Sequence, residues 1–263
     1  MLILLPPSEG KTAPRRGAAL DLEGLSLPSL TAARAAVIDS LVALCQGDEA
    51  KAMEVLGVPK TQPELVALNA GLASAPTARA DAIYTGVLYD ALDAPSMSPP
   101  AKRRAASRVM VTSSVFGLVG MGDRIPAYRL SGDTTLPGLG GVQAHWRSHL
   151  GPAAVEALDQ TGGGDGLLID LRSGTYAAFW RPDQVAARTA TVRVLHEVKG
   201  VRKVVSHFNK ATKGRIVRAL MESGAAPKTP ARLADALRDL GWAVEVGDPT
   251  KKGTQLDVVV TDL

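Results

Sequence analysis

MLILLPPSEGK, residues 1–11, opens with five apolar residues and then stops at two prolines. A short apolar run bounded by turn formers predicts a strand that is buried on both faces. The turn that follows contains Ser8, Glu9, Gly10 and Lys11, which gathers side-chain and backbone donors at the carboxyl end of that strand. The Gly-x4-Gly-Lys-Ser/Thr spacing of a P-loop is absent, which leaves an anion-binding turn of another kind or a plain surface turn.

Strand and helix patterns alternate along the rest of the chain. Strands are expected at residues 1–5, 109–120, 166–173, 191–198 and 202–208, with a terminal pair at 242–247 and 255–263. Helices are expected at residues 29–45, 48–57, 63–72 and 230–241 and from about Asn209 onward, and residues 161–166 are expected to form a loop tip. Because these patterns are interleaved, the expected fold class is α/β (mixed α+β), a single compact domain over residues 1–263 with a central mixed sheet and surrounding helices.

The composition limits the classes of protein to which the chain can belong. The 263 residues are 46% hydrophobic and 21% charged, which is typical of a soluble globular protein. The single cysteine, Cys45, has no partner within the chain, so a reducing cytoplasm is expected. No stretch approaches the roughly 20 apolar residues of a membrane span, so no membrane partner is expected. The net charge of +4 favours nucleic acid only slightly, because a solvated Lys/Arg surface gives the same total.

A basic run is the most informative feature after the first strand. Residues 199–218 contain lysines and arginines but no acid. Lys210 and Lys213 fall in the first turns of the expected helix, where the helix dipole disfavours cations. Lysines at that position are useful if an anion is bound there, with Ser206 and Asn209 as further donors. The alternative is a solvated basic face.

Residues 111–130, VTSSVFGLVGMGDRIPAYRL, gather hydroxyl and charged groups. A serine triad would need a histidine and an aspartate placed in space, and the Gly-x-Ser-x-Gly elbow is absent. His145 and His149 have the i, i+4 spacing that puts both on one helix face, but no Glu of a zinc motif lies between them. We therefore expect no metal and no cofactor.

Residues 136–150, LPGLGGVQAHWRSHL, have the glycine spacing of the hairpin in a helix-hairpin-helix DNA-binding element. Gly138 and Gly140 would form the hairpin, and Arg147 would lie where the second helix reaches a phosphate. The preceding residues, YRLSGDTT, are poor in helix formers. The alternative is a glycine turn that starts the helix containing Trp146.

Taken together, the motifs resemble the YaaA family of peroxide-stress proteins over essentially the whole chain. The motifs that carry the resemblance are MLILLPPSEGK, YTGVLYDAL, SSVFGLVGMGDRIPAYRL, LPGLGGVQAHWRSHL, LIDLRSGTYAAFW and SHFNKATKGRIVRAL. Two positions depart from the family pattern: Phe116 stands where many members have Tyr, and Asp170 where others often have Asn.

The resemblance implies an α/β domain of unusual fold with a positively charged cleft. It also implies protection from hydrogen peroxide, limitation of free iron, and DNA binding with a helix-hairpin-helix. The residues it places at the cleft are Ser8, Lys11, Tyr84, Tyr89, Tyr128, Arg129, Trp146, Ser173, Tyr176, Lys210 and Lys213.

Two functions follow from the sequence and the resemblance. The first is a cytoplasmic protein that binds double-stranded or structured DNA without sequence preference and so limits iron-dependent oxidative damage. The second is an enzyme that acts on a small anionic substrate, such as a nucleotide or an amino acid. An open groove as wide as a duplex would favour the first, and a closed pocket for one anion would favour the second. The expected anion- or DNA-binding residues are Ser8, Lys11, Tyr84, Tyr89, Ser113, Tyr128, Arg129, Gly138, Gly140, Trp146, Ser173, Tyr176, Ser206, Lys210, Lys213 and Arg215.

Overall fold

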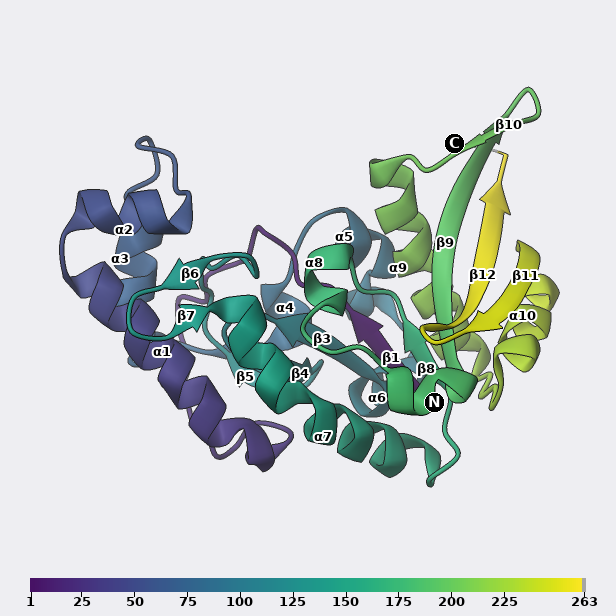
Figure 1. The fold of residues 1–263 in the computed structure, drawn as a ribbon, viewed down its shortest axis with the longest axis horizontal. Helices are drawn as coiled ribbons and strands as arrows, with labels where there is room; N and C mark the ends of the chain where they lie inside the picture. Colours follow the sequence, from purple (N-terminus) through teal and green to yellow (C-terminus); the bar gives the residue numbers. More distant parts are fainter. Residues whose placement is uncertain (262–263) are drawn as a thin grey trace.

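An eight-stranded mixed sheet runs through the centre of the computed structural model, which describes residues 1–261 (Figure 1). The strand order is β11-β12-β9-β8-β1-β3-β4, and β10 pairs with β9. The strands of this sheet are β1 (Leu2–Leu5), β3 (Val109–Ser113), β4 (Gly117–Gly120), β8 (Leu168–Asp170), β9 (Thr189–Val198), β10 (Val201–Lys203), β11 (Ala243–Thr250) and β12 (Gly253–Val260). Two small sheets pair β2 (Ala78–Arg79) with β5 (Arg124–Ile125) and β6 (Thr135–Leu136) with β7 (Gly140–Gly141). The mixed α/β class expected from the sequence is confirmed.

Helices surround the sheet, and some of them begin at the capping residues that the sequence supplies. The helices are α1 (Thr31–Gln46), α2 (Glu49–Leu56), α3 (Glu64–Ala70), α4 (Ala80–Ile83), α5 (Val87–Leu92), α6 (Pro99–Arg108), α7 (Val142–Gly162), α8 (Gly174–Ala177), α9 (Ser206–Ser223) and α10 (Pro230–Asp239). Asp48, Ser98 and Thr229 each accept a hydrogen bond from a backbone N–H in the first turn of α2, α6 and α10. Short 3-10 turns lie at Pro28–Leu30, Ala94–Ser96 and Asp183–Arg188.

Strand β1 decides where a site can form. All four of its residues are buried, and it pairs in parallel with β3 on one side and with β8 on the other. The chain therefore leaves β1 in one direction and later returns to its other side. In open α/β sheets, such a switch point opens a crevice outside the carboxyl ends of the strands. The turn after β1 lies at that crevice.

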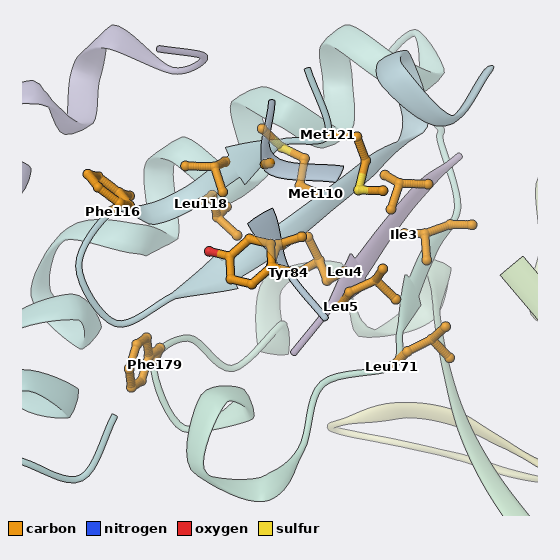
Figure 2. Close-up of a cluster of buried hydrophobic side chains, with 14 of the residues drawn as sticks. Ile3, Leu4, Leu5, Tyr84, Met110, Phe116, Leu118, Met121, Leu171 and Phe179 are labelled. Atoms are coloured by element: carbon orange, nitrogen blue, oxygen red, sulfur yellow. The ribbon is translucent and has the colours of Figure 1, made fainter. Parts of the chain in front are cut away.

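The core continues directly beneath this crevice. Figure 2 shows apolar side chains of β1, β3 and β4 gathered beside Tyr84, with Leu171 and Phe179 nearby. Ile3, Leu4 and Leu5 are fully buried, as expected of a strand covered on both faces. A rigid apolar layer thus supports the residues that follow each of these strands.

One expected strand was wrong in part. The strand predicted at residues 202–208 ends at Lys203, and α9 begins at Ser206 rather than near Asn209. Val201–Lys203 form only a short antiparallel pair with the end of β9 before the chain turns into the helix. The last two residues of the strand predicted at 255–263 lie outside the described residues.

Among the described residues, one helical segment, Pro28–Gln46, is long and apolar enough to span a membrane by length and composition alone. In the fold it packs against α3 and α7, and it contains a fully buried arginine. Arg34 donates to the carbonyls of Ser26, Phe116 and Leu118 at 2.7–3.0 Å. Arg34 thus ties this helix to the β3–β4 hairpin.

Candidate functional site

A pocket of about 510 Å³ lies at the carboxyl end of β1. It is lined by Pro6, Pro7, Ser8, Glu9, Gly10, Thr85, Gly86, Val87, Leu88, Tyr89, Arg129, Leu130, Ser131, Ser173, Tyr176 and Lys210. These residues come from the turn after β1, the start of α5, the segment after β5, the segment after β8, and α9. Six of the expected site residues line it together: Ser8, Tyr89, Arg129, Ser173, Tyr176 and Lys210.

Hydrogen bonds to the α5 region hold the turn after β1 in place. The Ser8 hydroxyl donates to the Gly10 carbonyl at 2.5 Å and accepts from the Thr85 N–H at 3.0 Å. The Tyr89 hydroxyl donates to the Pro6 carbonyl at 2.7 Å. Both ends of the turn are therefore fixed to one wall of the pocket.

Lys11 lies beneath this turn instead of lining the pocket. Its ammonium donates to the Ser8 carbonyl at 2.7 Å, and Nζ is 4.0 Å from the centre of the Tyr128 ring. Burial, together with a smaller effect of the Arg129 charge and partly opposed by Glu9, lowers the pKa of Lys11 to about 7. Lys11 therefore changes its charge near neutral pH while supporting the turn.

The lowered pKa of Lys11 predicts that the free energy of unfolding depends on pH. Its folded-state pKa lies below the ordinary value of 10.5, so the unfolded chain binds more protons between about pH 7 and 10.5. The contribution of Lys11 to stability must therefore rise with pH across this window. In urea unfolding, the stability of the wild type minus that of Lys11→Met is expected to increase from pH 7 to pH 9.5. The matched substitution Lys60→Met, at an exposed position, should show no such trend, and a flat Lys11→Met difference would contradict the assignment.

A chain of buried hydroxyls forms the layer under Lys11. The Ser113 Oγ accepts from the N–H groups of Val115 and Phe116 at 3.2 and 3.0 Å. The Ser113 hydroxyl can therefore donate a hydrogen bond to the Tyr128 hydroxyl, 2.8 Å away. The Tyr128 hydroxyl is in turn 3.1 Å from the Tyr84 hydroxyl. Burial raises the pKa of both tyrosines, so these hydroxyls stay protonated.

Arg129 is the cation on the pocket wall whose position is best defined. Fully buried Asn69 on α3 donates to the Arg129 carbonyl at 2.7 Å and accepts from the Arg129 N–H at 2.8 Å. Arg129 Nη2 lies 2.5 Å from Glu9 Oε1. A neutral amide 60 residues away thus holds the backbone from which the guanidinium enters the pocket.

Helix α9 contributes one lysine to the pocket and a second behind it. Lys210 is exposed and lines the pocket. Lys213 donates to the Leu171 carbonyl at 3.2 Å, and burial lowers its pKa, partly opposed by Asp170. Because α9 begins at Ser206, both lysines lie beyond its first turn. The side chain of Ser206 lies outside the described residues.

A buried ion pair stabilises the wall after β8. Arg172 donates to both oxygens of Asp170, at 2.8 and 2.7 Å, and also to the carbonyls of Tyr176 and Trp180. This ties the segment that carries Ser173 and Tyr176 to the end of β8. The aspartate at position 170, a departure from the family pattern, is thus matched by a buried partner.

Several expected site residues lie elsewhere. Trp146 is fully buried and donates to the Ser114 carbonyl at 2.7 Å, so it belongs to the core and not to the pocket. Gly138 and Gly140 lie on the β6–β7 hairpin, and Arg215 is exposed on α9. These residues do not line the pocket. Tyr84, Ser113 and Tyr128 form its buried support.

The helix-hairpin-helix considered for residues 136–150 would need a first helix in the preceding residues 128–135, and the structure has no helix there. The hairpin and the helix that follows, α7, are present, but residues 126–134 contain no helix. The backbone there is held by Asn69, which bonds Arg129, and by the Ser114 hydroxyl, which donates to the Leu130 carbonyl. The element is a glycine hairpin that starts α7, and Gly138 and Gly140 both have positive φ.

The two histidines of α7 make internal contacts. His145 Nε2 lies 3.0 Å from the Ala33 carbonyl, and His149 Nδ1 lies 2.7 Å from the His145 carbonyl. Burial lowers the pKa of His145. Within residues 1–261, no group of three or more His, Cys, Asp or Glu side chains is placed to hold a metal ion.

Three polar side chains of the pocket were missed by sequence reasoning. Thr85 and Ser131 line the pocket, and Glu9 was noted in the turn but was not assigned to the site. Glu9 had a detectable signal, its position in the turn after β1. Asn69, behind Arg129, had none, because a buried asparagine in a short helix has no pattern of its own.

Fold and site together define a mixed α/β protein with a pocket of small-molecule size at the switch point of its sheet, where Arg129 and Lys210 supply positive charge. The chain belongs to the family described as peroxide stress protein YaaA, whose model matches residues 1–246. It is 56% identical to a UPF0246 protein of Streptomyces coelicolor, with all of both chains covered. A UPF0246 protein of Corynebacterium efficiens is 45% identical over 98% of this chain and all of the relative. Membership of this family supports a role in peroxide stress.

Proposed function

We propose that this chain acts in the cytoplasmic response to peroxide by binding a phosphate-bearing ligand of nucleotide size in the pocket at the end of β1. The observation that carries the proposal is the pocket itself, with about 510 Å³ of space and two cationic side chains on its walls. Small-molecule sites are typically about 300–1,000 Å³ in volume and use a few placed polar groups. A volume of about 510 Å³ suits a mononucleotide and is too small for a length of duplex.

The lining fits such a ligand in two parts. Arg129 and Lys210 are suited to a phosphate, because a guanidinium and an ammonium donate to its oxygens from separate walls. Tyr176 is half-buried beside Ser173 and offers a ring against which a planar base could stack. An enzymatic reaction would use the amine of Lys11, because its pKa is near neutral. Here, however, that amine donates to the Ser8 carbonyl beneath the turn. Binding is therefore the function that the geometry supports best.

The proposal is tested by calorimetric titration with adenosine 5′-monophosphate. Lys210→Ala and Arg129→Gln are each expected to weaken binding by about tenfold or more, because each removes a charge-assisted contact to phosphate. Lys60→Ala removes an exposed positive charge elsewhere and serves as the matched control. Equal affinities for all four proteins would contradict the assignment of the pocket.

DNA binding is a second proposed function, and the surface of residues 199–218 favours it. Four exposed basic side chains there make no ion pair among the described residues: Lys199, Lys203, Lys210 and Arg215. Two others are engaged, since Arg202 pairs with Glu197 and Glu245, and Arg218 pairs with Asp93. We propose that the exposed four contact phosphates of double-stranded or structured DNA, and that coverage of DNA limits iron-dependent damage.

This second function predicts a salt-dependent affinity. The triple variant Lys199→Ala, Lys203→Ala and Arg215→Ala is expected to reduce the slope of log K against log salt by about 3, at roughly 0.9 per lost phosphate contact. The control triple, at exposed Lys51, Lys60 and Lys102, should keep the wild-type slope. Electrophoretic shifts of duplex and junction DNA across a salt series give the measurement. No binding at low salt would exclude this function.

A further inference from the structure

Glu9 and Arg129 form an ion pair on the wall of the pocket. Arg129 Nη2 is 2.5 Å from Glu9 Oε1, and both residues line the pocket. Their surroundings differ strongly, because the Glu9 side chain is 77% exposed and that of Arg129 is 19% exposed. The carboxylate therefore reaches from solvent to a cation that is mostly enclosed.

The backbone of Arg129 is held in place independently of Glu9. Asn69, fully buried, bonds both the N–H and the carbonyl of Arg129. Arg129 Nε is buried and has no hydrogen-bond partner among the described residues. The side-on pairing of Nε and Nη2 with two oxygens, which guanidinium groups favour with phosphates and carboxylates, is thus only half made. The backbone that carries the guanidinium is thus fixed by Asn69, and the donors of the guanidinium are incompletely used.

Glu9 is the more easily displaced partner. It lies in the turn after β1, and its carboxylate makes this one ion pair. Because the Glu9 carboxylate is exposed, water competes for it and its side chain loses freedom in holding the contact, which limits what the pair contributes. An arriving anion that bonds both Nε and Nη2 would replace a weak contact by a complete one.

We propose that the Glu9 carboxylate occupies the phosphate subsite of the pocket, and that a phosphate-bearing ligand displaces it to bind Nε and Nη2 of Arg129. This inference rests on the proposed pocket function and adds an internal competitor to it. Every anion must displace the Glu9 carboxylate, so the affinity for each anion is lowered by the same factor. Weakly binding anions are thereby kept from filling the site, while a ligand with further contacts to Lys210 and Tyr176 still binds.

The test compares Glu9→Gln with Glu23→Gln by calorimetric titration with inorganic phosphate and with adenosine 5′-monophosphate. Glu23 is exposed in the following loop, so its substitution makes the same charge change outside the pocket. Glu9→Gln is expected to bind both probes about three- to fivefold more tightly than the wild type, the range of an exposed ion pair. Glu23→Gln should match the wild type.

Nitrogen-15 NMR of the arginine side chains gives a second readout. On addition of phosphate to the wild type, the Arg129 Nε–H signal should shift and exchange more slowly with water, because this group gains a partner. Tighter binding by Glu9→Gln together with that shift supports the displacement. If the wild type binds but Glu9→Gln and Glu23→Gln are equal, the competitor is refuted and the pocket function stands. If neither the wild type nor Glu9→Gln binds either probe, both proposals fail.

The phosphate can come from a free nucleotide or from the end of a nucleic acid. A short duplex with a 5′ phosphate and the same duplex without it separate these sources. If Glu9→Gln tightens binding of the phosphorylated duplex alone, the pocket takes the end of a strand. If it tightens only the mononucleotide, the pocket takes a free ligand.

Discussion

Trp146→Ala is expected to lower the free energy of unfolding by about 3–5 kcal/mol, the range for removing a large aromatic side chain from a core. Trp146 on α7 is fully buried, and its indole N–H donates to the Ser114 carbonyl at 2.7 Å. Its ring lies against Gly117, where any side chain would collide with it.

Urea unfolding at neutral pH measures this loss, and two further variants locate its cause. Trp146→Phe keeps most of the ring volume but leaves the Ser114 carbonyl unpaired, so a loss of about 1–2 kcal/mol is expected. Trp242→Ala removes the same side chain at a half-buried position and should lose less than Trp146→Ala. Equal losses for the two alanine variants would show that Trp146 is not the core residue described here.

Asp170→Asn is expected to destabilise the protein by about 3 kcal/mol or more, because it leaves the Arg172 guanidinium buried without a counter-ion. The pair is almost completely enclosed, with side-chain exposures of 1% for Arg172 and 7% for Asp170. An asparagine keeps one acceptor but turns an NH₂ group toward the guanidinium. Because Arg172 also holds the carbonyls of Tyr176 and Trp180, affinity for phosphate should fall as well.

A surface pair supplies the matched control for this variant. Arg193 and Asp257 are joined by the same two-nitrogen geometry, but Arg193 is 47% exposed. Asp257→Asn should therefore change the free energy of unfolding by less than about 1 kcal/mol. If both aspartate variants lost the same small amount, the pair behind β8 would have no special role in stability.

Local pattern was enough to predict most of the elements, and the failures have physical causes. The apolar run at residues 1–5 and the capped helices at 48–57 and 230–241 are present as expected. The boundary at 202–208 was misplaced because β-branched valines continue past the last strand pair into a solvent-exposed connection. Val204, just past the last paired residue Lys203, is exposed and follows the composition of a strand without the pairing that would extend it.

The site was predicted in part for a similar reason. Ser8, Tyr89, Arg129, Ser173, Tyr176 and Lys210 do line one pocket, and the family resemblance together with the turn motifs indicated them. Trp146 was assigned to the same place and lies in the core instead. Residue type tells which side chains could bind an anion, but burial decides which of them a ligand can reach.

What the sequence by itself determined is the buried strand at Leu2–Leu5, the polar turn after it, and the basic composition of residues 199–218. Each is a property of neighbouring residues and can be read without knowing what packs against them. Only the tertiary structure decided three contacts. Asn69 hydrogen-bonds the backbone of Arg129, Lys11 lies under the turn against the Tyr128 ring, and Glu9 pairs with the Arg129 guanidinium. These contacts join segments brought together by the strand order around β1, and the desolvation that lowers the pKa of Lys11 exists only once that packing is complete.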